Sequence, residues 1–108
     1  MNLVQIVLTT EAAERIAAAS RPDKVIRVNG ELVGGCNMDV DYSLYWDEPQ
    51  PADQVIQLDA MTFVVDPETV RYIDADRLTI DFRPQQGFRL VTPQQFLAYG
   101  IQLKERWT

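Results

Sequence analysis

Residues 38–47 read MDVDYSLYWD and alternate between apolar and polar side chains along the whole stretch. The apolar set is Met38, Val40, Tyr42, Leu44 and Trp46, and the other set is Asp39, Asp41, Ser43, Tyr45 and Asp47. Because successive side chains of a strand point to opposite faces, this period of two predicts a half-buried strand of an antiparallel sheet. We expect the fold to be built around this strand.

The segment ahead of this strand continues the period of two and contains two turn signals. Residues 25–28 and 31–33 are predicted as strands, with Asn29-Gly30 between them as a type I′ hairpin turn, in which both central residues need a positive φ. This hairpin leads into Gly34-Gly35-Cys36. The paired glycines suit a bulge or a close backbone approach, because the lysine and further glycines of a phosphate-binding loop are absent.

Further strands and helices are predicted on both sides of this region. Strands are expected at residues 3–8, 54–58, 61–65, 78–82 and 87–91. Helix starts are predicted at Thr9-Thr10-Glu11, at Asp66-Pro67 and at Thr92-Pro93, the last helix running to about Tyr99. The sequence thus predicts a single mainly β (α+β) domain over residues 1–108, with about seven short strands and two or three short helices.

The composition excludes several classes of protein. The formal charge is −6 and the ten basic residues are scattered, which argues against nucleic acid and against an anionic membrane surface. The apolar runs are too short to span a bilayer and no leader is recognisable, so we expect a cytoplasmic protein. Histidine is absent and no nucleophile–base pair is visible, so we expect the chain not to be an enzyme.

Cys36 is the one cysteine of the chain, which excludes an internal disulfide. As a thiolate it is a candidate ligand for iron or for an iron–sulfur cluster. A cluster usually takes four thiolates, so the other ligands would come from a second copy, from oxygen ligands, from an external thiol or from a partner. The alternative is that Cys36 is a small buried apolar side chain, which is what free cysteine most often is.

Acidic and aromatic residues suggest two other kinds of site. Asn37, Asp39, Asp41 and Glu48 mimic the spacing of a calcium-binding loop, but Tyr42 replaces its essential glycine, so a solvated strand face is favoured. The aromatic side chains are candidates for lining a ligand pocket, or for the core and for contacts with a partner or a second copy; they are Tyr42, Tyr45, Trp46 and Trp107. The period of two favours the core for Tyr42 and Trp46.

Short motifs follow one another in a fixed order along about four-fifths of the chain. They are Ile6-Val7-Leu8-Thr9, Ala12-Ala13-Glu14-Arg15-Ile16, Ile26-Arg27-Val28, Gly34-Gly35-Cys36, Trp46-Asp47-Glu48-Pro49, Asp53-Gln54-Val55, Phe63-Val64-Val65-Asp66-Pro67, Tyr72-Ile73-Asp74, Leu78-Thr79-Ile80-Asp81-Phe82 and Gly87-Phe88. In this order and spacing they resemble the HesB/IscA-like family of A-type iron–sulfur cluster carriers. The resemblance implies a compact β-sandwich or pseudo-barrel with flanking helices.

The resemblance also implies a site and a function. Cys36 matches the family's cysteine after the glycines, so the cofactor-binding residues implied here are Cys36, Gly34 and Gly35, with Cys36 as the metal ligand. The family's C-terminal Cys-x-Cys pair is missing, since residues 96–100 read FLAYG. The implied function is that of a divergent iron–sulfur cluster biogenesis protein, a labile iron or cluster carrier that uses Cys36 across a homodimer.

The implied partners are the iron–sulfur assembly machinery or client apoproteins. The alternative function is a cluster-free protein-interaction domain on the same fold, in which residues 96–99 pack rather than bind metal.

Overall fold

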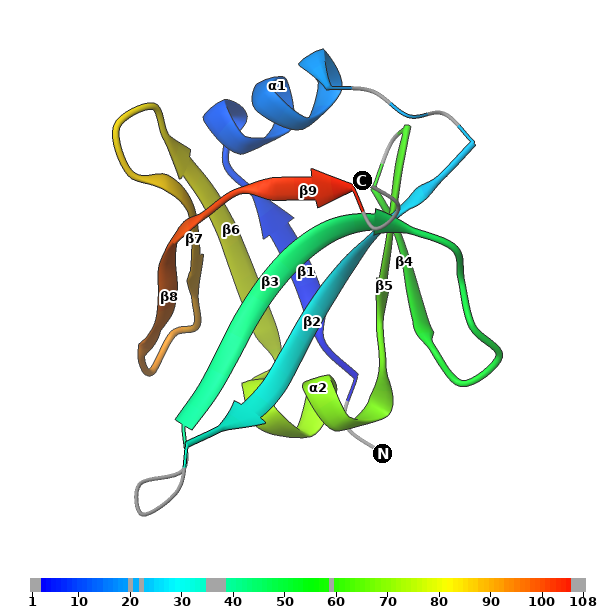
Figure 1. The fold of residues 1–108 in the computed structure, drawn as a ribbon, viewed down its shortest axis with the longest axis vertical. Helices are drawn as coiled ribbons and strands as arrows, with labels where there is room; N and C mark the ends of the chain where they lie inside the picture. The colour runs from blue at the N-terminus through cyan, green and yellow to red at the C-terminus, as the bar shows by residue number, and fades with distance from the viewer. Residues whose placement is uncertain (1–2, 20, 22, 35–38, 59, 106–108) are drawn as a thin grey trace.

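The computed structural model describes residues 3–19, 21, 23–34, 39–58 and 60–105. These residues form nine strands and two helices (Figure 1). In chain order they are β1 (Gln5–Leu8), α1 (Thr10–Ala18), β2 (Val25–Val33), β3 (Asp39–Asp47), β4 (Gln54–Leu58), β5 (Met61–Val65), α2 (Pro67–Ile73), β6 (Arg77–Arg83), β7 (Gly87–Val91), β8 (Phe96–Ile101) and β9 (Leu103–Glu105). The mainly β class is confirmed, with more strands than predicted.

The strands form two mixed sheets. One has the order β1-β6-β7-β8, and the other has the order β4-β5-β2-β3-β9. Three pairs are parallel, namely β1 with β6, β2 with β5 and β3 with β9, and the remaining pairs are antiparallel. Helices α1 and α2 lie at opposite ends of the sheets (Figure 1).

The core lies between the inner faces of the sheets and is closed by the helices. Each strand contributes alternate side chains, as its period of two predicts. The buried set includes Ile6, Leu78, Ile80, Phe88 and Leu90 from one sheet, Ile26, Val28, Leu44, Trp46 and Phe63 from the other, and Ala12, Ile16 and Ile73 from the helices. Burying one large apolar side chain contributes about 1.5–3 kcal/mol, so this set is the main source of stability.

Two of the predicted helix starts are confirmed. The Thr9 hydroxyl accepts a hydrogen bond from the Ala12 amide at 3.2 Å and caps α1. Asp66 caps α2 by accepting from the Thr69 amide at 3.2 Å, and Pro67 occupies its first turn. In α2, Ile73 is buried as predicted and Val70 is half-buried.

The predicted turn at Asn29-Gly30 is wrong, because β2 runs unbroken from Val25 to Val33. Asn29 pairs with Ser43 and Gly30 with Tyr42, in the middle of the antiparallel ladder with β3. A Cβ at position 30 would lie 3.2 Å from the rings of Tyr42 and Tyr72. The glycine is therefore required for the close approach of two aromatic rings and not for a turn.

The predicted helix after Thr92-Pro93 is also wrong, because residues 96–101 form β8. The Thr92 amide donates to the Gln95 carbonyl at 2.9 Å, and the Gln95 amide donates to the Thr92 hydroxyl at 3.2 Å. These bonds close a tight connection that folds β8 back onto β7. The Thr-Pro pattern that begins many helices therefore forms a hairpin turn here.

Candidate functional site

The candidate site lies where β2 and β3 join. Val33 pairs with Asp39, so residues 34–38 connect the two strands, and Cys36 is the middle residue of this connection. Gly34 has a φ of +101°, a value that L side chains rarely adopt. Gly35 and Cys36 lie outside the described residues. The correction at Gly30 thus moves the hairpin turn to the segment that contains the cysteine.

The end of β2 and the start of β3 extend together, as a two-stranded ribbon, beyond the other strands of the sheet (Figure 1). The pairing of β2 with β5 ends at Val28, so residues 29–33 of β2 have β3 alone as a strand partner. Leu32 is 46% exposed and Val33 is 41% exposed, although both are apolar. The end of β2 from which the chain continues to Cys36 is therefore exposed to solvent.

Acidic side chains surround this end of the ribbon. Glu31 pairs directly with Asp41, and Asp39 is two residues along the same face. All three are exposed, and residues 31–41 contain no Lys or Arg. The resulting negative potential favours a cation over an anion near Cys36. Among the residues that the structure describes, no three Asp, Glu, Cys or His side chains are close enough to hold a metal ion.

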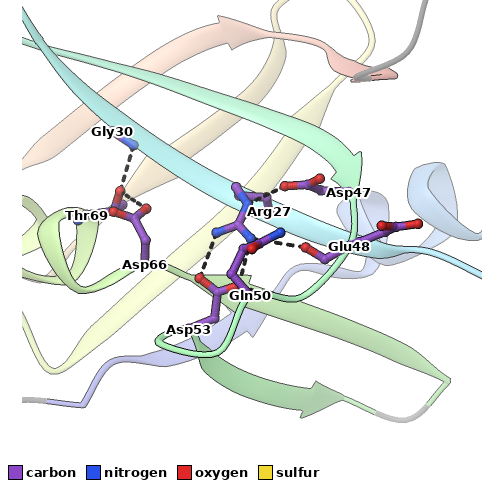
Figure 2. Close-up of polar contacts among 8 residues, drawn as sticks. All are labelled: Arg27, Gly30, Asp47, Glu48, Gln50, Asp53, Asp66 and Thr69. Atoms are coloured by element: carbon purple, nitrogen blue, oxygen red, sulfur yellow. Dashed lines mark hydrogen bonds and ion pairs between the residues drawn. The ribbon is translucent and has the colours of Figure 1, made fainter.

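A hydrogen-bond chain supports the ribbon where it leaves the sheet (Figure 2). The Gly30 amide donates to the Thr69 hydroxyl at 2.9 Å, and this hydroxyl donates to Asp66 Oδ1 at 2.5 Å. Because β5 no longer pairs at this point, the Gly30 amide would otherwise lack an acceptor. The residues that begin α2 thus also hold the base of the hairpin.

The other end of the ribbon is held by a buried ion network (Figure 2). The Arg27 guanidinium donates from Nε to Asp47 Oδ2 at 2.5 Å, and from Nη1 and Nη2 to the Asp53 carboxylate at 2.9 and 2.6 Å. Nη2 also donates to the Glu48 carbonyl at 3.3 Å. The Asp53 carboxylate accepts in addition from the Gln50 amide at 2.6 Å. The network fastens the loop after β3 onto β2.

The charges in this network stabilise one another. The side-chain hydrogen bond to Asp53 raises the pKa of Arg27 above its ordinary value, against the opposing effect of burial. Burial alone would raise the pKa of Asp53, but hydrogen bonds from Arg27 and Gln50 lower it below its ordinary value. Asp47, predicted on the polar face of its strand, is therefore a buried partner of Arg27 and not a solvated acid.

A second charged group lies on the four-stranded sheet. Burial alone would raise the pKa of Asp81, but hydrogen bonds from Arg89 and Thr9 lower it to about 2. The Thr9 hydroxyl donates at 2.8 Å, and Arg83 Nε lies 3.4 Å from the same carboxylate. Asp81 thus joins the start of α1 to the arginines of β6 and β7.

The structure tests the predicted roles of the acidic strand face and of the aromatic side chains. Asp39 and Asp41 are exposed on an extended strand, which confirms the strand over the calcium-binding loop. Tyr42 and Trp46 are each 7% exposed and belong to the core, as their period predicted. Trp107 lies outside the described residues.

Residues 96–99, expected to pack in the cluster-free alternative, pack only in part. Leu97 and Ala98 pack against the core, whereas Phe96 is 50% exposed and Tyr99 is 72% exposed. Their rings lie 6.0 Å apart between centroids. Sequence reasoning missed this exposed aromatic pair because it expected a helix there. It also missed Arg27 and Asp53, which are distant in sequence.

A family model described as iron–sulphur cluster biosynthesis matches residues 4–105. The fold is similar to Escherichia coli SufA, involved in biosynthesis of iron–sulfur clusters, with a TM-score of 0.65 and 22% identity over 83% of this chain and 82% of that one. A search of curated proteins gave no significant match.

Two further solved structures share the fold. A putative Fe–S biosynthesis protein from Lactobacillus acidophilus has a TM-score of 0.71 and 15% identity, over 94% of this chain and 90% of that one. IscA with a 2Fe-2S cluster has a TM-score of 0.52 and 17% identity, over 82% and 86%. No helix among the described residues is long and apolar enough to cross a membrane.

Proposed function

This chain belongs to the iron–sulphur cluster biosynthesis family, and on that premise we propose that it carries labile iron or an iron–sulfur cluster through Cys36, shared between two copies of the chain. The observation that supports the proposal is the position of Cys36 in the sequence, in the connection between β2 and β3 at the exposed end of the ribbon. A thiolate ligand in such a connection would be shared with a second copy and passed to a client.

The ligand chemistry explains why a second copy is needed. The chain has one cysteine and no histidine, so it provides a single sulfur ligand. Two copies provide two thiolates, and the remaining positions are left to carboxylates, tyrosine, an external thiol such as glutathione, or cysteines of a client. Oxygen ligands bind iron–sulfur clusters less well than thiolates. We therefore propose that the cargo is held weakly and passed on, without catalytic turnover.

A lone thiol ligand also requires reducing surroundings. Disulfide formation between two Cys36 side chains would remove both sulfurs from the site. We therefore propose that the carrier acts in the cytoplasm, with the assembly machinery or apoproteins as partners.

Anaerobic reconstitution with iron and sulfide tests this proposal. We expect sulfide-to-iron charge-transfer bands in the visible spectrum, about one cluster per dimer, and loss of these bands in Cys36→Ser. A matched control is the double variant Cys36→Ser with Ser43→Cys, which moves the thiol to the half-buried middle of β3. The control should stay colourless. A colourless wild-type protein, or a coloured control, would contradict the proposal.

A second candidate function is a cluster-free protein-interaction domain. The exposed aromatic pair Phe96 and Tyr99 favours it, because these residues occupy the segment where the family places its other two cysteines. Under this function Cys36→Ser leaves partner binding unchanged. Loss of binding through Cys36→Ser alone would exclude it.

A further inference from the structure

The outer face of the four-stranded sheet presents a row of four side chains that is exposed at its two ends and half-buried between them. Val7 pairs with Thr79, Thr79 with Val91, and Val91 with Phe96, so these four residues cross all four strands in one line. Val7 is 42% exposed and Phe96 is 50% exposed. The two helices lie at opposite ends of the sheets (Figure 1).

Arginines flank this row on both sides. β6 places Arg77 and Arg83 on the same face as Thr79, and Arg89 of β7 lies opposite Asp81. The strands of this sheet carry three arginines and one aspartate, a formal charge of +2 (three minus one), in a chain of −6. We call the set Val7, Arg77, Thr79, Arg83, Arg89, Val91 and Phe96 the arginine face.

The charges of this face are held in place. Asp81 lies on the same face but is only 8% exposed, and it binds both Arg83 and Arg89, so these arginines cover the one carboxylate of the face. The Arg89 guanidinium lies 5.8 Å from the centre of the Phe96 ring. Arg83 keeps 61% of its side chain exposed. A planar guanidinium beside an exposed aromatic ring is typical of the residues that dominate protein interfaces.

We propose that the arginine face binds an acidic segment of a partner protein, whose carboxylates pair with Arg77 and Arg83 and whose apolar side chains pack on the row from Val7 to Phe96. Guanidinium groups bind carboxylates through two parallel hydrogen bonds, and an apolar row selects side chains rather than small ions. The inference rests on the proposed function in one respect, since a biogenesis protein acts on other proteins.

The charge distribution disfavours two other occupants. A second copy docked through the same face would place arginines against arginines. A nucleic acid is a long polyanion that would extend past the arginine face. The rest of the protein, in a chain whose net charge is −6, would repel it there. A short acidic segment meets only the local charge of the face.

The test uses the Cys36→Ser protein, so that neither a cluster nor a disulfide takes part. The probe is a synthetic peptide that alternates glutamate and leucine, titrated into the nitrogen-15-labelled protein and followed by NMR. We expect amide shifts concentrated in residues 77–83 and 89–96, and affinity that falls as salt rises. The double variant Arg77→Gln, Arg83→Gln should bind about tenfold more weakly.

Matched controls separate this surface from general charge and stickiness. Arg71→Gln removes an arginine that is 70% exposed on α2 and should change affinity less than about twofold. Phe96→Ser should weaken binding, whereas Val55→Ser, at a 58% exposed position on β4, should not.

Four outcomes would overturn the proposal. They are shifts outside the arginine face, equal binding of a lysine–leucine peptide, tighter binding of an RNA oligonucleotide, and concentration-dependent shifts of the same residues without any peptide, which would assign the face to a second copy. A colourless reconstitution would leave these results unaffected, so failure of the carrier function and failure of this inference are distinguishable.

Discussion

The two ends of the β2–β3 ribbon are held in opposite ways. At one end the Arg27 side chain is 6% exposed and lies between Asp47 and Asp53, which are 1% and 2% exposed. At the other end Glu31 and Asp41 face each other in solvent, and residues 31–41 of the sequence include no Lys or Arg. The same pair of strands is thus anchored at one end by the ion network. At the other end, which we call the free end, the two strands pair only with each other, and Cys36 lies in the sequence that connects them there.

Removing the arginine should have the largest effect. Arg27→Met leaves two buried carboxylates without their partner, and we expect a loss of about 3–5 kcal/mol in the free energy of unfolding. Urea unfolding followed by circular dichroism measures this loss. Arg21→Met removes an exposed arginine paired with Glu105 and should cost less than about 1 kcal/mol. Equal losses in both variants would show that the Arg27 end is not specially anchored.

Adding one methyl group at the base of the ribbon should have the next largest effect. In Gly30→Ala the new Cβ lies 3.2 Å from Tyr42 and from Tyr72, and we expect a loss of about 1–3 kcal/mol. The second change Tyr72→Leu should relieve part of this loss, because it removes one of the two rings. Additive costs in the double variant would contradict the steric explanation.

Acid should weaken the anchored end through Asp53. The folded-state pKa of Asp53 is lowered, so its ionised form contributes stability above about pH 4, the ordinary range for aspartate. That contribution is lost as the pH falls through the folded-state pKa. We expect the Asp53→Asn variant to be less stable than the wild type at neutral pH. Its unfolding midpoints should therefore fall less steeply than those of the wild type between pH 6 and pH 2.5. Parallel curves for the two proteins would show that Asp53 is not responsible for the loss of stability in acid.

Reversing one charge at the free end should have the smallest effect, and it should stabilise. Glu31→Lys replaces a like-charge pair with an opposite-charge pair across from Asp41, and we expect a gain of about 0.5 kcal/mol. Glu31→Lys combined with Asp41→Lys restores a like-charge pair and should remove the gain. The difference should shrink at high salt, and a gain that persists there would point to packing instead.

Where the fold could be predicted, the signal lay within a few neighbouring residues. β4 and β5 have the predicted bounds, and the Asp66-Pro67 start of α2 is confirmed. Asn29-Gly30 failed because its turn preference is local, whereas its conformation is set by the ladder with β3 and by two rings from elsewhere. Thr92-Pro93 failed for a similar reason, since β7 offered an edge to the residues that follow.

The supports of the candidate site could not be predicted from local patterns. Arg27 looks like an isolated charge between Ile26 and Val28, and its partners Asp47 and Asp53 are 20 and 26 residues away. Their meeting depends on strand register, which a single sequence does not reveal. The position of Gly34-Gly35-Cys36 before the long strand was evident, but its place at the free end was not.

The chain passes from β8 in one sheet to β9 in the other, and this order affects folding during synthesis. β9 is parallel to β3 and covers residues 44–46 at the edge of the five-stranded sheet. During synthesis that edge stays open until Glu105 has left the ribosome, long after the Cys36 segment has emerged. An uncovered strand edge can pair with other chains. The outer edge of β3 is thus paired late, when β9 adds to the sheet.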